Sequence, residues 1–196
     1  MRRTLLAVVA VIAALLVAAC GQPEPQFRNI DITGADYGKN FRLNDHAGKP
    51  RQVADFRGKV VLMFFGYIQC PDVCPTTMGE LALVMKQLGG DAARVQVLFV
   101  TVDPERDTKE LLAQYVPAFD PSFLGLYGDA AATQETAKAF RVFYQKQPGK
   151  TPGAYSIDHT AGSYVFDPQG RLRLYVRHGQ GGADLVADIR LLLAEK

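Results

Sequence analysis

Cysteine is scarce in this chain of 196 residues, which has only three. Two of them, Cys70 and Cys74, are separated by just three residues. A small secreted domain that is held together by disulfides would carry more cysteines at wider spacing, so the chain does not belong to that class. A close pair is instead typical of a reactive site or of a metal-binding site.

An excess of charge is also missing. The chain has 22 Lys and Arg side chains against 20 Asp and Glu side chains, and no block of like charges interrupts the sequence. Proteins that bind nucleic acid through electrostatic attraction carry basic stretches or a basic excess. The sequence therefore predicts no nucleic-acid partner. It also contains no internal repeat and no low-complexity tract.

The only long apolar run lies at the N-terminus, from Leu5 to Ala19, shortly after two arginines and directly before Cys20. A helix that spans a bilayer needs about 20 apolar residues, so this shorter run predicts a secretory signal. The end of the run resembles a bacterial lipobox. The resemblance implies a lipoprotein signal peptide over residues 1–19, with Cys20 as the lipidated first residue of the mature protein. An uncleaved N-terminal anchor is the alternative.

Both alternatives place the protein in the bacterial cell envelope, anchored to a membrane and facing the periplasm or extracytoplasmic side, where thiols are readily oxidised. Residues 20–28 include two prolines and predict a short extended tether. Residues 29–196 are enough for one hydrophobic core, and a second domain is unnecessary at this length. We therefore expect a single folded domain on a membrane tether.

An unbroken apolar run from Val60 to Phe65 predicts a strand that is buried on both faces, because a strand with one solvent-exposed face would alternate apolar and polar residues. The cysteine pair follows this strand at once. Apolar residues at helical spacing then extend to Leu88, before Gly89 and Gly90. The two cysteines are thus predicted where a central strand becomes a helix.

This position has chemical consequences for the thiols. The unpaired N–H groups and the dipole of a helix N-terminus stabilise a thiolate, so we expect a lowered thiol pKa in an exposed loop. Cysteines four residues apart lie on one face if the first helical turn includes both of them. They can then form a disulfide or bind one soft metal ion. Two buried structural thiols are the alternative.

The rest of the chain alternates between strand and helix patterns. A hairpin is predicted from strands at 41–43 and 51–53, and a second hairpin from strands at 163–166 and 172–176. Further strands are predicted at 95–102 and 123–127, helices at 108–116, 130–140 and 183–194, and a loop at 147–153. This order predicts an α/β fold whose central mixed sheet has helices on both faces.

Four short motifs occur in order along the chain: Phe65-Gly66-Tyr67, the segment from Cys70 to Pro75, the segment from Val102 to Thr108, and Asp158-His159-Thr160. Together they resemble the Sco/SenC family of copper proteins over residues 29–196. The resemblance implies a thioredoxin-like fold with an N-terminal β-hairpin extension. The cysteine spacing differs from the usual redox motif of that fold, in which two residues separate the cysteines.

The resemblance also implies a function. In this family the two cysteines and the late histidine bind copper, which here would be Cys70, Cys74 and His159. Two thiolates suit Cu(I), and an imidazole nitrogen is a ligand that Cu(II) also accepts. The family delivers copper to the dinuclear copper A centre of cytochrome c oxidase subunit II. The implied partners are that subunit, a periplasmic copper donor or thiol reductant, and the membrane, through the lipid anchor.

Several other polar residues are weighed for the site. Asp103 and Asp158 are candidates to support the metal ligands, although helix capping or ion pairing explains them equally well. His46 lies in a predicted turn and His178 at the end of a hairpin strand. Both are expected to be solvated and to lie outside the metal site.

Two enzymatic functions compete with copper delivery. A thiol-disulfide reductase would use Cys70 and Cys74 as a redox-active disulfide to reduce the cysteines of the copper A centre. His159 separates these hypotheses, because dithiol exchange needs only the two thiols. A peroxidase of the peroxiredoxin type would share the fold, but it would need a cysteine environment that activates peroxide, and the sequence supports this only weakly.

Overall fold

The computed structural model of the protein describes residues 26–195. The predicted signal peptide and Cys20 lie outside the described residues. Within that described part, no helix has both the length and the apolar character that crossing a membrane requires.

An eight-stranded mixed sheet forms the centre of the molecule, in the order β1-β10-β9-β4-β5-β6-β2-β3, and β7 and β8 form a separate two-stranded sheet. The strand bounds are β1 Ile30–Asp31, β2 Leu43–Asp45, β3 Pro50–Arg51, β4 Val60–Gly66, β5 Val95–Thr101, β6 Leu124–Tyr127, β7 Tyr144–Pro148, β8 Tyr155–His159, β9 Ser163–Phe166 and β10 Leu172–Val176. The helix bounds are α2 Val73–Leu88, α3 Lys109–Tyr115, α4 Ala130–Ala139 and α5 Ala183–Ala194, with short 3-10 turns η1 Val53–Phe56 and η2 Gly89–Arg94.

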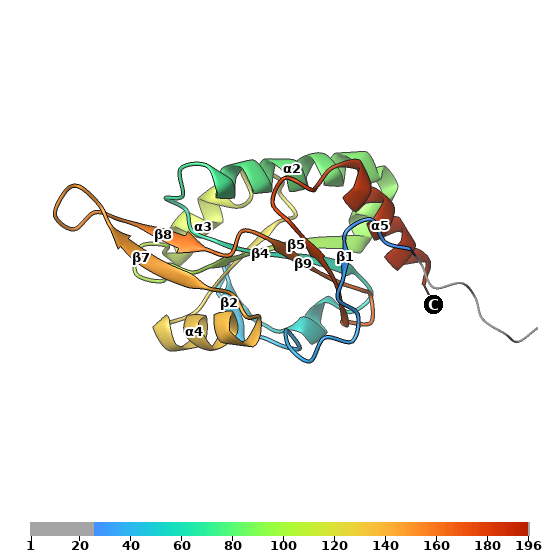
Figure 1. Ribbon diagram of the computed structural model, residues 1–196, viewed down its shortest axis with the longest axis horizontal. Helices are drawn as coiled ribbons and strands as arrows, with labels where there is room; N and C mark the ends of the chain where they lie inside the picture. The colour runs from blue at the N-terminus through green and yellow to red at the C-terminus, as the bar shows by residue number, and fades with distance from the viewer. Residues whose placement is uncertain (1–25, 196) are drawn as a thin grey trace, which may run out of the picture.

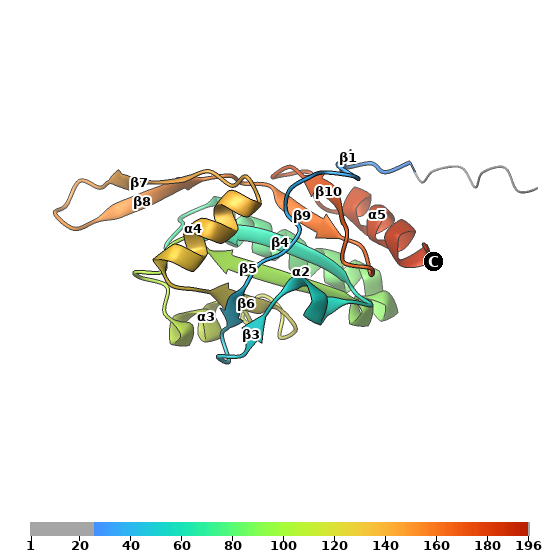
Figure 2. The same cartoon turned by 90° about the horizontal axis from the view of Figure 1, so that it is seen from below.

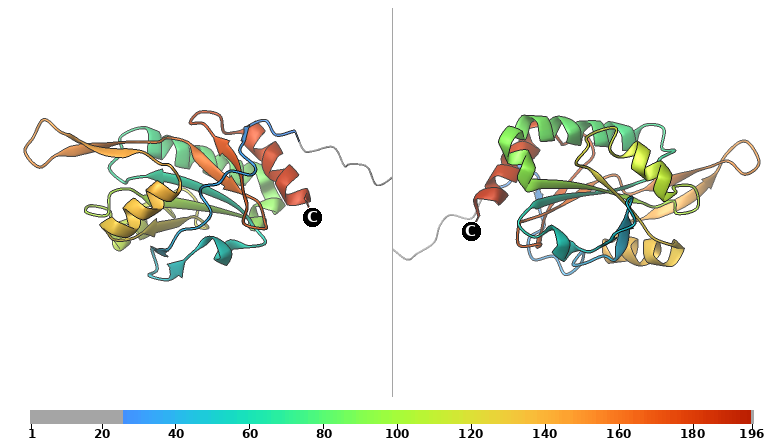
Figure 3. Two further views of the ribbon diagram at one scale, coloured as in Figure 1. Left: turned by 60° about the horizontal axis from the view of Figure 1, so that its bottom comes forward. Right: turned by 180° about the vertical axis from the view of Figure 1, so that it is seen from behind.

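Helices cover both faces of the sheet, as the alternating pattern predicted. Strands β4, β5 and β6 are parallel neighbours, so the helices that connect them, α2 and α3, lie on the same face. Helix α5 packs beside α2 on that face, and α4 covers the opposite face (Figures 1 and 3). The predicted mixed α/β architecture is confirmed.

Strand β4 is the centre of the core. It pairs in parallel with β5 and antiparallel with β9, and every residue from Val60 to Gly66 is buried. Helices lie above and below a strand in this position, so both of its faces must be apolar, which explains the unbroken run of hydrophobic residues. The cysteine-bearing loop therefore begins at the end of the most deeply buried strand.

The N-terminal hairpin is present, but its place differs from the prediction. Strands β2 and β3 pair antiparallel, and β2 also pairs with β6. The hairpin thus extends one edge of the main sheet, and its strands are displaced by one or two residues from those predicted. At the opposite edge, β1 pairs with β10.

The β7–β8 arm, meaning the two-stranded sheet formed by β7 and β8, was not expected from the sequence. Residues 147–153 were expected to form only a loop, but Gln147 and Pro148 belong to β7, and the chain turns between Gly149 and Ala154. The arm projects from one end of the molecule (Figure 2). His159 is the last residue of β8, so the arm carries a predicted metal ligand.

The start of the described chain is fixed to helix α5. Asp188 is fully buried, and its carboxylate accepts hydrogen bonds from the backbone N–H groups of Arg28 and Asn29 and from the Asn29 side chain, at 2.8 to 2.9 Å. A buried carboxylate needs such donors. The predicted tether therefore meets the folded region near residue 28, beside α5.

Candidate metal centre

The cysteine loop connects β4 to α2. Asp72 is the N-cap residue of α2, so Cys74 lies in the first helical turn and Cys70 lies in the preceding loop. The backbone N–H of Cys74 donates a hydrogen bond to the sulfur of Cys70, at 3.4 Å. The helix N-terminus thus provides a donor to one thiol, as the sequence suggested. The loop is less exposed than expected, because Cys74 is completely buried and Cys70 is half-buried.

The His159 side chain enters the same space from the C-terminal end of β8, where the β7–β8 arm joins the body of the molecule. Its Nδ1 lies 3.0 Å from the carbonyl oxygen of Thr160, which can only accept a hydrogen bond, so Nδ1 carries the proton. The lone pair is therefore on Nε2, which lies 3.5 Å from the sulfur of Cys74. The rings of Phe64 and Tyr67 contact the imidazole edge-on, at centroid distances of 6.0 and 5.9 Å. These aromatic contacts orient the ring toward the cysteines.

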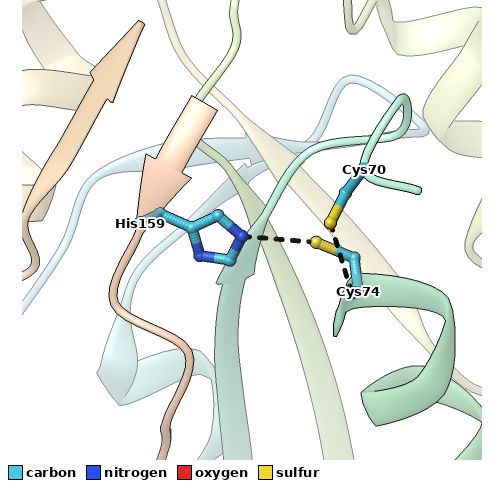
Figure 4. A group of neighbouring side chains, drawn as sticks. All are labelled: Cys70, Cys74 and His159. Carbon is cyan, nitrogen blue, oxygen red and sulfur yellow. Dashed lines mark hydrogen bonds between the residues drawn. The ribbon is translucent and has the colours of Figure 1, made fainter. Parts of the chain in front are cut away.

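The structure brings all three predicted ligands together. One potential ligand atom from each of Cys70, Cys74 and His159 lies within 4.8 Å of the other two, and the side chains converge on a common space (Figure 4). Two sulfur atoms and one imidazole nitrogen form a donor set that suits copper, Cu(I) above all. The two cysteines are free thiols here. Their formation of a redox-active disulfide stays a prediction.

Burial decides the protonation of the site. It raises the pKa of the Cys74 thiol far above its usual range, and the neighbouring Cys70 adds to the effect. The expected lowering of the thiol pKa is therefore wrong for Cys74, because the loss of water outweighs the helix N-terminus. Burial also lowers the pKa of His159, against the opposing effects of the Thr160 carbonyl and Asp158. The imidazole is consequently neutral at neutral pH and can act as a ligand.

The two candidate supporting carboxylates behave differently. Asp103 is fully buried and accepts hydrogen bonds from the Tyr155 hydroxyl and from Arg106, so it contacts the arm that carries His159. Asp158 is exposed, and its carboxylate accepts a hydrogen bond from Gln147 on the neighbouring strand. Of the two, only Asp103 connects the arm to Arg106 and the loop that follows β5.

The other two histidines lie outside the metal site. His178 is exposed, as predicted, and shares a hydrogen bond with Thr77 at 3.0 Å. His46 was also expected to be solvated, but it is half-buried, and its Nδ1 accepts a hydrogen bond from the backbone N–H of Gly125 at 3.0 Å. The predicted turn packs against β6, which explains the difference.

A buried carboxylate close to the cysteine loop was missed by the sequence analysis. Asp107 is only 2% exposed, and its Oδ2 accepts hydrogen bonds from the Thr101 hydroxyl at 2.6 Å and from the backbone N–H of Ile68 at 3.0 Å. Its Oδ1 is buried and finds no hydrogen-bond partner among the described residues. Nothing in the sequence distinguishes this aspartate from Asp103, because only the folded loop shows which carboxylate lacks a positive partner.

We expect Asp107→Asn to weaken the dependence of stability on pH. Burial raises the pKa of Asp107 from 3.8 to about 6, despite its two hydrogen bonds. The folded protein thus keeps this proton at pH values where the unfolded chain has lost it, so the stabilisation is complete below about pH 4 and is lost as the pH rises through 6. This shift of the Asp107 pKa corresponds to about 3 kcal/mol of unfolding free energy, present at low pH and absent at high pH. Urea unfolding of both proteins at about pH 4 and about pH 7.5 measures it.

Asp45 provides a control of opposite sign. It is also buried, but hydrogen bonds from Lys49, Arg51 and Ala47 outweigh the effect of burial and hold its pKa below the usual value. Its stabilisation is therefore present at neutral pH and lost in acid, so Asp45→Asn should cost more at neutral pH than at pH 4. If Asp107→Asn left the full pH dependence of the native protein, the assignment of a raised pKa would be wrong.

The family assignment comes from comparison with known proteins. A family model described as SCO1/SenC matches residues 31–194. The mitochondrial SCO2 homolog of Mus musculus is 38% identical over 157 residues, which cover 79% of this chain and 62% of the mouse protein. The chain thus spans less than two thirds of the length of this curated relative.

Solved structures of similar proteins support the same family assignment. ScoI of Bradyrhizobium japonicum with copper bound is 39% identical, with a TM-score of 0.73 over 81% of this chain and 99% of that one. Apo Sco1 of Thermus thermophilus is 41% identical, with a TM-score of 0.76 over 87% of this chain and 99% of that one. The fold is therefore shared with proteins of known structure, and this chain belongs to the SCO1/SenC family.

Proposed function

We propose that this protein binds copper through Cys70, Cys74 and His159 and delivers it to the copper A centre of cytochrome c oxidase subunit II. The convergence of two sulfur atoms and one imidazole nitrogen within 4.8 Å carries the proposal. A similar protein, ScoI of Bradyrhizobium japonicum, has been solved with copper bound, which supports the choice of metal. Copper is the cargo of the protein in this proposal.

The burial of the three ligands suits a site that must give up its metal. Cys74 is enclosed, whereas Cys70 and His159 are half-buried and border the solvent. An acceptor could therefore replace Cys70 or His159 first while the other ligands still hold the ion. Transfer by stepwise exchange of ligands needs this kind of partial access, since a fully enclosed ion could leave only after unfolding.

We also propose that Cys20 is lipidated and that residues 20–28 tether the domain, residues 29–196, to the outer face of a membrane. The first described residues lie at the end of the molecule opposite the β7–β8 arm (Figure 2). A tether at that end would leave the arm and the adjacent metal site free to meet a partner. Holding both proteins on one membrane surface would raise their effective concentration.

Copper binding by the reduced full chain, measured with Cu(I) and with Cu(II), tests the proposal. We expect one ion per chain and its transfer to copper-free subunit II, detected by the visible absorption of the dinuclear centre. His159→Ala should weaken copper binding by at least tenfold, because losing a group that only supports a ligand already costs about 10- to 100-fold. His178→Ala, a change at an exposed histidine, is the matched control and should have no effect.

The thiol-disulfide reductase is the alternative that the same experiment separates. If the chain bound no copper but reduced the oxidised cysteines of subunit II, and did so equally well after His159→Ala, the proposed function would be replaced by dithiol exchange. The raised pKa of Cys74 leaves Cys70, the more accessible sulfur, as the thiol that would attack a disulfide.

A further inference from the structure

The position of His159 depends on contacts other than the pairing of the main sheet. Among residues 26–195, β7 and β8 pair only with each other, so no backbone ladder in this range connects the β7–β8 arm to the eight-stranded sheet. The arm extends away from the body of the molecule (Figures 1 and 2). An isolated two-stranded sheet is marginally stable in water. Side-chain contacts between the arm and the body therefore help to hold the histidine beside the cysteines.

Arg106 makes several of these contacts. Its Cζ lies 3.5 Å from the centre of the Tyr155 ring, and its Nη1 donates to the Tyr155 carbonyl oxygen at 2.8 Å. The same nitrogen donates to Oε1 of Gln69 at 3.0 Å, and Nε pairs with Oδ2 of Asp103 at 2.5 Å. One guanidinium thus joins the start of β8, the residue before Cys70 and the loop that follows β5.

The geometry of β8 carries this contact to the metal site. Tyr155 is the first residue of the strand and His159 the last, about 13 Å away at the usual rise per residue. Between them, the backbone N–H of Ile157 donates to the Tyr67 hydroxyl at 3.2 Å, and Ile157 is buried. A strand that is held at its start and its middle has little freedom at its end, so fixing Tyr155 restricts where His159 can lie.

We propose that Arg106 is a positioning residue that seats the β7–β8 arm, so that His159 lies beside Cys70 and Cys74 before copper arrives. This inference rests on the proposed copper-binding function. A lysine cannot replace the arginine, because its single ammonium lacks the planar fork that stacks on a ring and donates in several directions at once. Arg106→Lys therefore keeps the charge and removes the positioning.

A double-mutant cycle on the full chain tests the proposal. We expect Arg106→Lys to weaken copper binding about tenfold, because the guanidinium that stacks on Tyr155 and donates to its carbonyl oxygen is lost. In a His159→Ala background the same change should alter the affinity by less than about twofold, because Arg106 then has no ligand to position. An equal loss in both backgrounds would show a general structural role and overturn the proposal, as would no loss in either.

A measurement without copper separates this inference from the proposed function. Proton NMR of the reduced, copper-free chain should show contacts between the His159 ring and the rings of Phe64 and Tyr67, and these contacts should weaken in Arg106→Lys. Unchanged contacts would overturn the positioning role even if copper binds. Copper binding that is absent in the native chain would instead refute the proposed function, while the NMR result would still decide the role of Arg106.

The chain offers a matched control and a second variant. Arg51 pairs with the buried Asp45 at 2.8 Å, and its side chain is 19% exposed, close to the 18% of Arg106, but it lies on β3 at the far edge of the sheet. Arg51→Lys should therefore leave copper binding unchanged. If Arg106→Lys fails to fold, Tyr155→Leu removes the ring on which Arg106 stacks. It should also weaken copper binding in the native background and have little effect in the His159→Ala background. A Tyr155→Leu cycle with no dependence on His159 would overturn the proposal.

Discussion

Copper affinity should rise steeply with pH, and Cys74→Ser should abolish specific copper binding. Burial keeps the Cys74 thiol protonated throughout the neutral range, so a copper ion must displace that proton before the sulfur can bind. Each displaced proton makes the affinity about tenfold higher per pH unit, which gives about 100-fold between pH 6 and pH 8 from this thiol alone. Serine keeps the shape but offers no soft ligand at the enclosed position.

Competition with a Cu(I) chelator of known affinity, repeated across this pH range, measures both effects. His159 should contribute little to the slope near neutral pH, since its lowered pKa means that it has no proton to lose there. The slope in His159→Ala should therefore match that of the native chain, although the affinity is lower. A pH-independent affinity in the native chain would mean that Cys74 does not bind the metal as a thiolate.

The parts of this fold that the sequence analysis predicted correctly are those that local patterns determine. The unbroken run in β4 can be stable only between two layers, and the alternation of strands and helices leaves few topologies open. A helix was predicted at 108–116, and α3 does begin there, with the Thr108 hydroxyl accepting a hydrogen bond from the N–H of Leu111. In each case, neighbours in sequence carry the physical cause.

The parts that were missed depend on contacts between distant segments. Strand β7 contains Gln145, Lys146 and Gln147, which form no apolar pattern, and pairing with β8 is what makes it a strand. The burial of Cys74 and the raised pKa of Asp107 likewise result from packing that no local pattern encodes. The late histidine was assigned through a family resemblance, because a single histidine has no periodicity that would reveal its partners.

Replacing Gly66 with alanine should damage the metal site more than any other change of one methyl group that the structure suggests. Gly66 is the last residue of β4, immediately before the loop that carries the cysteines. An added Cβ would lie 2.8 Å from the sulfur of Cys74 and 3.0 Å from ring carbons of Phe64 and Phe99. These distances are too short for carbon and sulfur in contact, so the side chains must move. We expect a loss of about 1–3 kcal/mol in unfolding free energy, as overpacked cores show.

The effect on copper should exceed this loss of stability. The sulfur of Cys74 lies 3.5 Å from Nε2 of His159, and pushing it away from Gly66 changes a distance on which the three-ligand set depends. Copper affinity should fall at least tenfold, about the loss seen when ligands are poorly supported. Gly79→Ala is the control, because Gly79 lies within α2 and its added Cβ would meet no atom within 4 Å. That change should stabilise the helix by about 0.5–1 kcal/mol and leave copper binding intact. Gly66→Ala with native copper affinity would show that Cys74 can shift freely, and the site would then not be preorganised.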